Sequence, residues 1–220
     1  MPPPLEILYE DNHLLAVNKP AGLPTMGTPG GHPTLLTVAK EYIGRKYHKP
    51  GNVYLGVMSR LDAPVTGVVL LARTSKAARR LTEQFRTHAV QKIYWALVEG
   101  KIDPPQGRLV DWLGEDERHR RMHIVGPTLA GAKEARLNYR RLAVQGAGAL
   151  VEIELETGRK HQIRLQLAHH GHPIVGDRKY GSRQPFPNGI ALHARRLVVA
   201  HPIGGEPLVV EAPLPREWPR

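Results

Sequence analysis

The sequence contains no cysteine. Without thiols the chain cannot form disulfides, use a cysteine nucleophile, or hold zinc or an iron–sulfur cluster through cysteine. It also lacks any apolar run near the ~20 residues of a membrane-spanning helix. The start, Met1 to Glu6, has neither the basic nor the apolar region of a signal peptide. We therefore expect a cytoplasmic protein that does not bind membranes.

Acidic residues are scarce relative to basic ones. The chain has 31 Lys and Arg against 20 Asp and Glu, a formal net charge of +11 at pH 7. A folded surface does not need so large an excess to stay solvated, and the phosphate backbone of a nucleic acid is the commonest partner that does. A nucleic acid is the favoured partner, while a membrane surface or a general basic bias stays open.

The spacing of apolar residues predicts more strands than helices. Strands are predicted over residues 14–17, 67–71, 93–98, 135–144, 150–155, 190–200 and 207–211. Helices are predicted over 35–47, after Thr74 or Ser75, and over 159–170, with Thr34 as the N-cap of the first. Strands joined by hairpins dominate, so we expect an α+β fold with a mixed, mostly antiparallel β-sheet and flanking helices.

The chain shows no repeat and no clear interdomain linker, so we expect a single domain over 1–220. Residues 1–10 are expected to be an extended N-terminal segment, because prolines occupy its start. Residues 102–133 have little periodicity and are expected to be a loop or a small hairpin insertion. Within them, 118–123 is a basic cluster, which is either a solvated face or a set of phosphate contacts.

A lone carboxylate stands beside an arginine between two apolar stretches. The segment reads Ser59-Arg60-Leu61-Asp62-Ala63-Pro64-Val65-Thr66-Gly67. A turn at a sheet edge can present Asp62 to a ligand. Alternatively, Asp62 can begin the turn by binding nearby backbone N–H groups. Spacing alone leaves both interpretations open.

Two further segments combine aromatic and basic residues. The first, Lys92-Ile93-Tyr94-Trp95-Ala96-Leu97-Val98-Glu99-Gly100, places Tyr94 in an apolar strand, where a tyrosine is usually a core residue. Trp95 is expected to point to the opposite face. The second, Thr157-Gly158-Arg159-Lys160-His161-Gln162-Ile163-Arg164, opens a basic helix whose N-terminus can receive an anion. A solvated basic face is the alternative for Arg159 and Lys160.

Together the three segments resemble the RluA family of RNA pseudouridine synthases, and the resemblance runs from about Leu5 to Leu214. The family's first pattern is His-Arg-Leu-Asp, a short variable stretch, Ser or Thr, Gly and an aliphatic run. This chain has Ser59 at the histidine position. The resemblance implies a pseudouridine synthase-like catalytic domain, which breaks the N1–C1′ bond of a uridine in RNA and rejoins the base through C5. It implies neither a cofactor nor a metal.

The resemblance also assigns site residues. Asp62 matches the family's catalytic aspartate, and Tyr94 matches a tyrosine that stacks on the flipped uracil. Arg164 matches an arginine that pairs with the aspartate and keeps it ionised. The expected substrate-binding residues are Arg60, which would fill the space that the flipped uridine leaves, and Arg159, Lys160, His161 and Gln162.

Many relatives carry an N-terminal RNA-binding domain of the S4 type. Here the catalytic-domain pattern starts almost at Met1, so we expect no such domain. Recognition would then come from the catalytic domain and its loops, which favours a compact rRNA or tRNA stem-loop. We expect the protein to act as a monomer.

Two other functions stay open. A non-catalytic RNA-binding protein would explain the charge, but it leaves Asp62, Tyr94 and Arg164 without a role. A metal-dependent hydrolase is suggested by His169-His170-Gly171-His172 near Asp177. Neighbouring histidines on one helix do not easily converge on an ion, and no His-Glu-x-x-His element is present.

Overall fold

The computed structural model describes residues 5–27, 32–116 and 121–218. The chain divides into two compact units, where a single domain was expected. Unit 1 comprises Met1–Gln91 and Ala194–Arg220, and unit 2 comprises Lys92–His193. Each unit has strands, at least one helix and an apolar core of its own.

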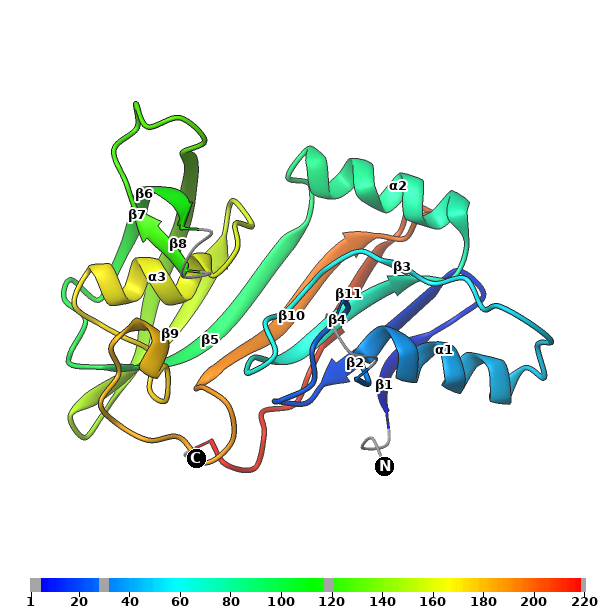
Figure 1. Ribbon diagram of the computed structural model, residues 1–220, viewed down its shortest axis with the longest axis horizontal. Helices are drawn as coiled ribbons and strands as arrows, with labels where there is room; N and C mark the ends of the chain where they lie inside the picture. The colour runs from blue at the N-terminus through cyan, green and yellow to red at the C-terminus, as the bar shows by residue number, and fades with distance from the viewer. Residues whose placement is uncertain (1–4, 28–31, 117–120, 219–220) are drawn as a thin grey trace. The chain divides into compact units, whose positions relative to one another are not determined.

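Unit 1 is built on strands in the order β1-β2-β4-β10-β11, with β3 also paired to β4 (Figure 1). The bounds are β1 Glu6–Glu10, β2 Leu14–Lys19, β3 Gly56–Val57, β4 Thr66–Ala72, β10 Leu192–Ala200 and β11 Pro207–Glu211. The pairs β1–β2, β2–β4, β3–β4 and β10–β11 are antiparallel. The expected extended start is therefore a paired strand from Glu6 onward, and residues 1–4 lie outside the described residues.

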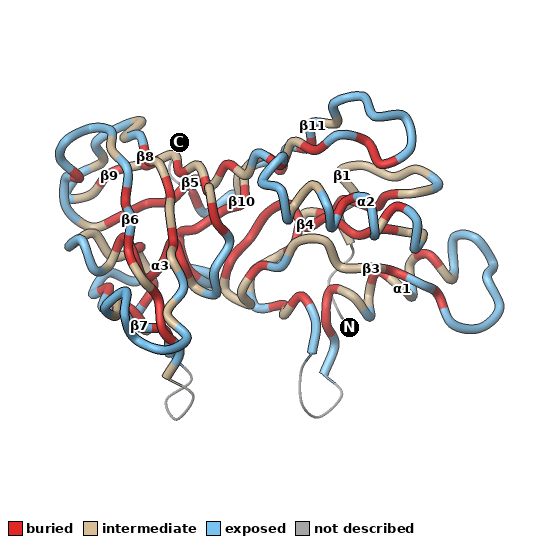
Figure 2. Tube along the Cα trace, turned by 90° about the horizontal axis from the view of Figure 1, so that it is seen from above, coloured by how far each residue is buried: buried red, intermediate tan, exposed pale blue. Residues whose placement is uncertain are grey.

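Strand β4 is buried along its whole length, as its continuous apolar run predicts (Figure 2). Val68 and Leu70 pack with helix α2, Ser75–Arg86, through Ala77 and Leu81. Thr74 caps this helix: its hydroxyl accepts the N–H of Ala77 at 3.2 Å. The buried strand gives the turn in front of it a fixed support.

Helix α1 spans Leu35–Lys46 and begins at the predicted cap, Thr34. The hydroxyl of Thr34 accepts the N–H of Thr37 at 3.2 Å, and the Thr37 hydroxyl accepts the N–H of Thr34 at 2.9 Å. This reciprocal pair satisfies two donors at the helix start. Both predicted caps in unit 1 are confirmed.

Unit 2 contains an antiparallel sheet in the order β5-β9-β8-β6-β7. The bounds are β5 Gln91–Glu99, β6 Gln106–Asp116, β7 Arg121–Ile124, β8 Lys133–Gln145 and β9 Gly148–Leu155. Helix α3, Gln162–His169, packs Leu165 against Leu113 and Ala135, and the short helix η2, Arg178–Tyr180, adds the ring of Tyr180 to this core.

Residues 102–133 are not an insertion on the fold. Strand β6 pairs with β8 from Gln106–Arg140 to Leu113–Lys133, and β7 closes a hairpin with β6. Residues 117–120, which include part of the predicted basic cluster, lie outside the described residues. The sheet of unit 2 depends on β6, because Leu113 belongs to its core.

The described chain has a mostly antiparallel sheet arrangement with three α-helices, which confirms the expected α+β class. The third helix begins at Gln162, later than the predicted start at Arg159, because His161 adopts a left-handed φ of 55°. Within the described part of the chain, no helix is both long and apolar enough to cross a membrane.

Candidate active site

Asp62 belongs to a turn that leads into β4, and backbone bonds hold this turn on both sides. The N–H of Leu61 donates to the Thr25 hydroxyl at 3.1 Å, and that hydroxyl donates to the Leu61 carbonyl at 2.8 Å. The N–H of Val65 donates to the Asp62 carbonyl at 3.0 Å. Asp62 is partly exposed, so the turn is fixed while its carboxylate side remains open to a ligand.

Lys19 anchors the same turn from inside, a role that the sequence analysis missed. Its side chain is fully buried. The ammonium donates to the carbonyls of Pro20 at 2.8 Å, Leu23 at 2.8 Å and Ala63 at 3.0 Å. An ammonium has three N–H donors, and all three find acceptors here. Lys19 therefore joins the end of β2 to the residue that follows Asp62.

The charge of Lys19 also acts on Asp62. Burial lowers the pKa of Lys19 to about 7, and attraction to the Asp62 carboxylate opposes this shift. The same attraction favours the ionised form of Asp62 whenever Lys19 carries its proton. Unit 1 thus supplies a cationic neighbour to the predicted catalytic carboxylate from its own residues.

Ser59 and Arg60 occupy different environments on the approach to Asp62. The Ser59 hydroxyl accepts the N–H of Leu70 at 3.0 Å, so it secures the segment to β4. Arg60 is exposed and has no hydrogen bond or ion pair with any part of the chain that the structure describes. Its guanidinium is available to an external partner, as the predicted RNA contact requires.

Tyr94 lies on the inner face of the sheet of unit 2. It pairs directly with Ile153 of β9, which is fully buried, so the two side chains share one face. Tyr94 itself is only partly buried. Trp95 lies on the other face, where its indole N–H donates to Glu152 at 3.2 Å. The predicted opposite orientation of Tyr94 and Trp95 is confirmed.

Arg164 forms a buried ion pair that the sequence did not indicate. Its Nε lies 2.6 Å from one carboxylate oxygen of Asp177 and its second nitrogen lies 2.8 Å from the other. The side chains are 6% and 1% exposed, and the guanidinium lies over the Tyr180 ring. This fork fixes the direction of Arg164. Asp62 belongs to the other unit, so its pairing with Arg164 stays a prediction.

Gln162 shapes the loop before α3 from the interior. Its side-chain oxygen accepts from the Thr157 hydroxyl at 2.7 Å and from the N–H of Arg159 at 3.0 Å. Its amide donates to the Arg136 carbonyl at 3.0 Å, and the residue is 3% exposed. We expected Gln162 to contact RNA, but these bonds give it a supporting role in the loop.

The remaining predicted contacts of this loop reach the surface to different extents. Arg159 is exposed, and its Nε donates to the Glu134 carbonyl at 3.0 Å. Lys160 is exposed and forms an ion pair with Glu115. His161 is partly buried, with Nδ1 at 2.6 Å from the Tyr180 hydroxyl. Arg159 is therefore the cation of this loop that carries no carboxylate partner among the described residues.

The histidines after α3 have separate partners. Nε2 of His170 lies 3.3 Å from a carboxylate oxygen of Asp111, and Nδ1 of His172 lies 3.1 Å from the Glu99 carbonyl. They serve different strands, β6 and β5, and do not converge on one point. Within the described residues, no group of three or more metal-ligating side chains is found.

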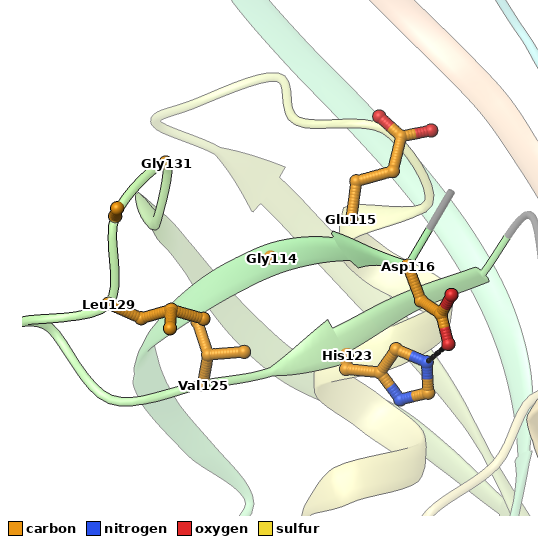
Figure 3. Close-up of a pocket in the computed structure, with 8 residues that line it drawn as sticks. Gly114, Glu115, Asp116, His123, Val125, Leu129 and Gly131 are labelled. Atoms are coloured by element: carbon orange, nitrogen blue, oxygen red, sulfur yellow. Dashed lines mark ion pairs between the residues drawn. The ribbon is translucent and has the colours of Figure 1, made fainter. Parts of the chain in front are cut away.

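A pocket of about 580 Å³ lies elsewhere on unit 2 (Figure 3). Its polar lining consists of Glu115, Asp116 and His123 from the β6–β7 hairpin, and Leu129 closes one side. Nε2 of His123 lies 3.6 Å from Asp116. None of the predicted site residues lines this pocket, so it is separate from the candidate active site.

Comparison with known proteins agrees with this geometry. Residues 13–169 match the family described as RNA pseudouridylate synthase. The chain is 36% identical over 218 residues to the uncharacterized RNA pseudouridine synthase YhcT of Bacillus subtilis, covering 97% of this chain and 70% of that protein. It is 38% identical over 223 residues to ribosomal large subunit pseudouridine synthase D of Nitrosomonas europaea, covering 96% and 62%. It thus spans about two thirds of the length of these relatives.

A shorter relative and a solved structure extend the comparison. The tRNA pseudouridine synthase C of Salmonella typhimurium is 33% identical over 236 residues, covering 97% of this chain and 87% of that protein. The structure of human RNA pseudouridylate synthase domain containing 4 superposes with a TM-score of 0.80 at 28% identity, covering 96% and 89%. The chain therefore belongs to the RluA-type RNA pseudouridine synthases.

Proposed function

We propose that this protein converts specific uridines of rRNA or tRNA to pseudouridine, with Asp62 as the essential carboxylate. The reaction breaks the N1–C1′ bond of the uridine and joins C1′ to C5, with loss of the C5 proton. It is an isomerisation, so no redox partner or group donor is needed. Relatives named for ribosomal RNA and for tRNA align over almost the whole chain, which supports either RNA as the substrate.

The observation that carries the proposal is the anchored turn at Asp62. Thr25 holds Leu61 through two hydrogen bonds, and buried Lys19 holds Ala63 through its ammonium. Both neighbours of the carboxylate are therefore fixed to β2 or to the loop that follows it. A carboxylate that must meet the same atoms in every turnover gains from such preorganisation.

Tyr94 and Arg164 are proposed as the other active-site groups. Tyr94 presents a partly exposed ring on the inner face of β5, which suits stacking on a uracil that has left the RNA stack. Flipping a base costs a few kcal/mol, and stacking in a pocket offsets part of that cost. Arg164 is held in one direction by Asp177, which suits a guanidinium that must meet a carboxylate or a phosphate in fixed geometry.

RNA recognition is proposed to use the exposed cations of both units. Arg60 and Arg159 are exposed, and neither has a carboxylate partner in the described part of the chain. With a net charge of +11, the long-range attraction to phosphates supplies affinity, and the catalytic turn selects the base. The monomeric state and the cytoplasmic location stay predictions.

The test separates chemistry from binding. RNA treated with wild type or with Asp62→Ala is digested to nucleosides, and pseudouridine is quantified by chromatography. We expect the wild type to form pseudouridine and Asp62→Ala to form none. RNA affinity of the variant should stay within about threefold of wild type, because one carboxylate supplies little of an attraction that is dominated by phosphates. Retained turnover in Asp62→Ala would contradict the proposed role of Asp62.

The same experiment addresses a non-catalytic RNA-binding protein. Such a protein would bind RNA with either residue at position 62 and form no pseudouridine with rRNA or tRNA as substrate. Wild-type binding without any product from either RNA class would therefore favour that alternative over the proposed function.

A further inference from the structure

Lys92 is a largely covered cation without a protein partner. It lies on β5, it is only partly exposed, and it has no hydrogen bond or ion pair with the residues that the structure describes. Burial lowers its pKa, and the charge of Arg159 lowers it further. A lysine in this state is destabilised by its surroundings unless an anion joins it.

Arg159 and Gly158 explain where such an anion would lie. Arg159 belongs to the exposed loop before α3 and is the charge that acts on Lys92. Nζ of Lys92 lies 3.8 Å from the position that a Cβ on Gly158 would occupy. Glycine at this point therefore leaves the ammonium uncovered. Two cations meet beside a gap in the loop, and no carboxylate of the described chain contributes to the electrostatic environment of Lys92.

The position along β5 links this pair to the candidate active site. Lys92 precedes Tyr94 by two residues, so both side chains leave the same face of the strand, about 7 Å apart along it. That separation is comparable to the distance between the base and a phosphate of one nucleotide. A base stacked on Tyr94 would bring its own or the adjacent phosphate within reach of Lys92.

We propose that Lys92 and Arg159 together bind one RNA phosphate next to the uridine that stacks on Tyr94. The inference rests on the proposed function, since it takes the base at Tyr94 as given. The phosphate would bridge the ammonium and the guanidinium and turn a repulsive pair into a favourable one. Lys92 is thus a substrate-binding residue that acts on the RNA backbone rather than on the base.

The test measures RNA affinity as a function of salt for Lys92→Met, which keeps the length of the side chain and removes its charge. We expect affinity to fall about tenfold or more, as for the loss of a charge-assisted hydrogen bond. The slope of log affinity against log salt should shrink by about 0.7, the value for one phosphate contact on a single strand. Lys92→Arg should retain most of the affinity.

Lys101→Met is the matched control. Lys101 is an exposed lysine of the same unit, and its substitution changes the net charge equally. We expect an affinity within about twofold of wild type for this control, because a distant exposed charge is screened by salt. If Lys92→Met lowers affinity and slope no more than Lys101→Met does, the proposal is wrong.

Two additional variants keep the test decisive. Gly158→Val retains both charges but covers the ammonium, and it should lower affinity as Lys92→Met does, even if the latter folds poorly. The pair Lys92→Met and Arg159→Met should be less than additive, because both remove contacts to one phosphate. Full additivity in this cycle would mean two independent contacts and would overturn the shared site.

Failure of this inference can be told apart from failure of the proposed function. Binding is measured in the Asp62→Ala background, where no turnover interferes. If wild type forms pseudouridine while Lys92→Met binds normally, only the phosphate site is wrong. If wild type forms no pseudouridine, the proposed function fails whatever the affinities are.

Discussion

Lys19 in unit 1 and Lys92 in unit 2 are two covered lysines that the structure treats in opposite ways. Lys19 is fully buried and gives each of its N–H donors to a carbonyl oxygen. Lys92 is largely covered and gives its donors to no described residue. In both, burial lowers the pKa. The comparison teaches that the partners of a buried cation, rather than its burial, separate a structural role from a binding role.

The ion pair of Arg164 and Asp177 extends the comparison to a third satisfied cation, and it should give the largest effect on stability. Arg164→Met leaves Asp177 buried without its partner, so the free energy of unfolding should fall by about 3–5 kcal/mol. Replacing Asp177 with Leu in the same chain should recover much of this loss. Urea unfolding measures both variants. A double variant no more stable than Arg164→Met would break the argument from pairing.

Lys19→Met should give the next largest effect. It leaves three carbonyls, including those of Leu23 and Ala63, without their donor, and we expect the free energy of unfolding to fall by about 3 kcal/mol. Lys92→Met is the counterpart in unit 2 and should leave stability equal or slightly higher, because it removes an unpaired charge. Urea unfolding near neutral pH compares the two. Equal losses in both variants would remove the distinction between the lysines.

The pH dependence of stability should show the smallest effect. The pKa of folded Lys19 is about 7, and that of an unfolded lysine is about 10.4. Between these values the unfolded chain holds more protons, so the free energy of unfolding should rise with pH, by about 2 kcal/mol from roughly pH 7 to pH 9. The rise is the difference between wild type and Lys19→Met in urea unfolding. A fall over this range would show that the three carbonyls hold the proton on Lys19.

Much of the fold could be predicted because local patterns agree with the packing. The run from Val68 to Ala72 is apolar at every position and becomes a strand buried throughout. Strand β6 was missed for an equally local reason. Its inward position at Asp111 is polar, and Gln166 donates to that carboxylate at 2.8 Å. A buried polar residue interrupts the apolar alternation by which a strand is recognised.

The candidate site was predictable only in part, since motif residues reveal their type but not their partners. Arg60 and Arg159 are exposed cations, as expected. Gln162 lies in the interior because its amide satisfies three groups of the surrounding loop. The support that Lys19 gives to the Asp62 turn could not be predicted, because its acceptors are backbone carbonyls and every sequence contains those. A lysine at the end of an apolar strand, just before Pro20, was the available signal.

The most direct test of the central claim is tritium release from RNA labelled at uridine C5. Isomerisation replaces the C5–H bond with a bond to C1′, so each product releases one label to water. We predict release by the wild type in proportion to pseudouridine formed, and none by Asp62→Asn, which keeps the shape of the side chain and removes its charge. Equal release by both proteins, or no release by the wild type from rRNA and tRNA, would contradict the account.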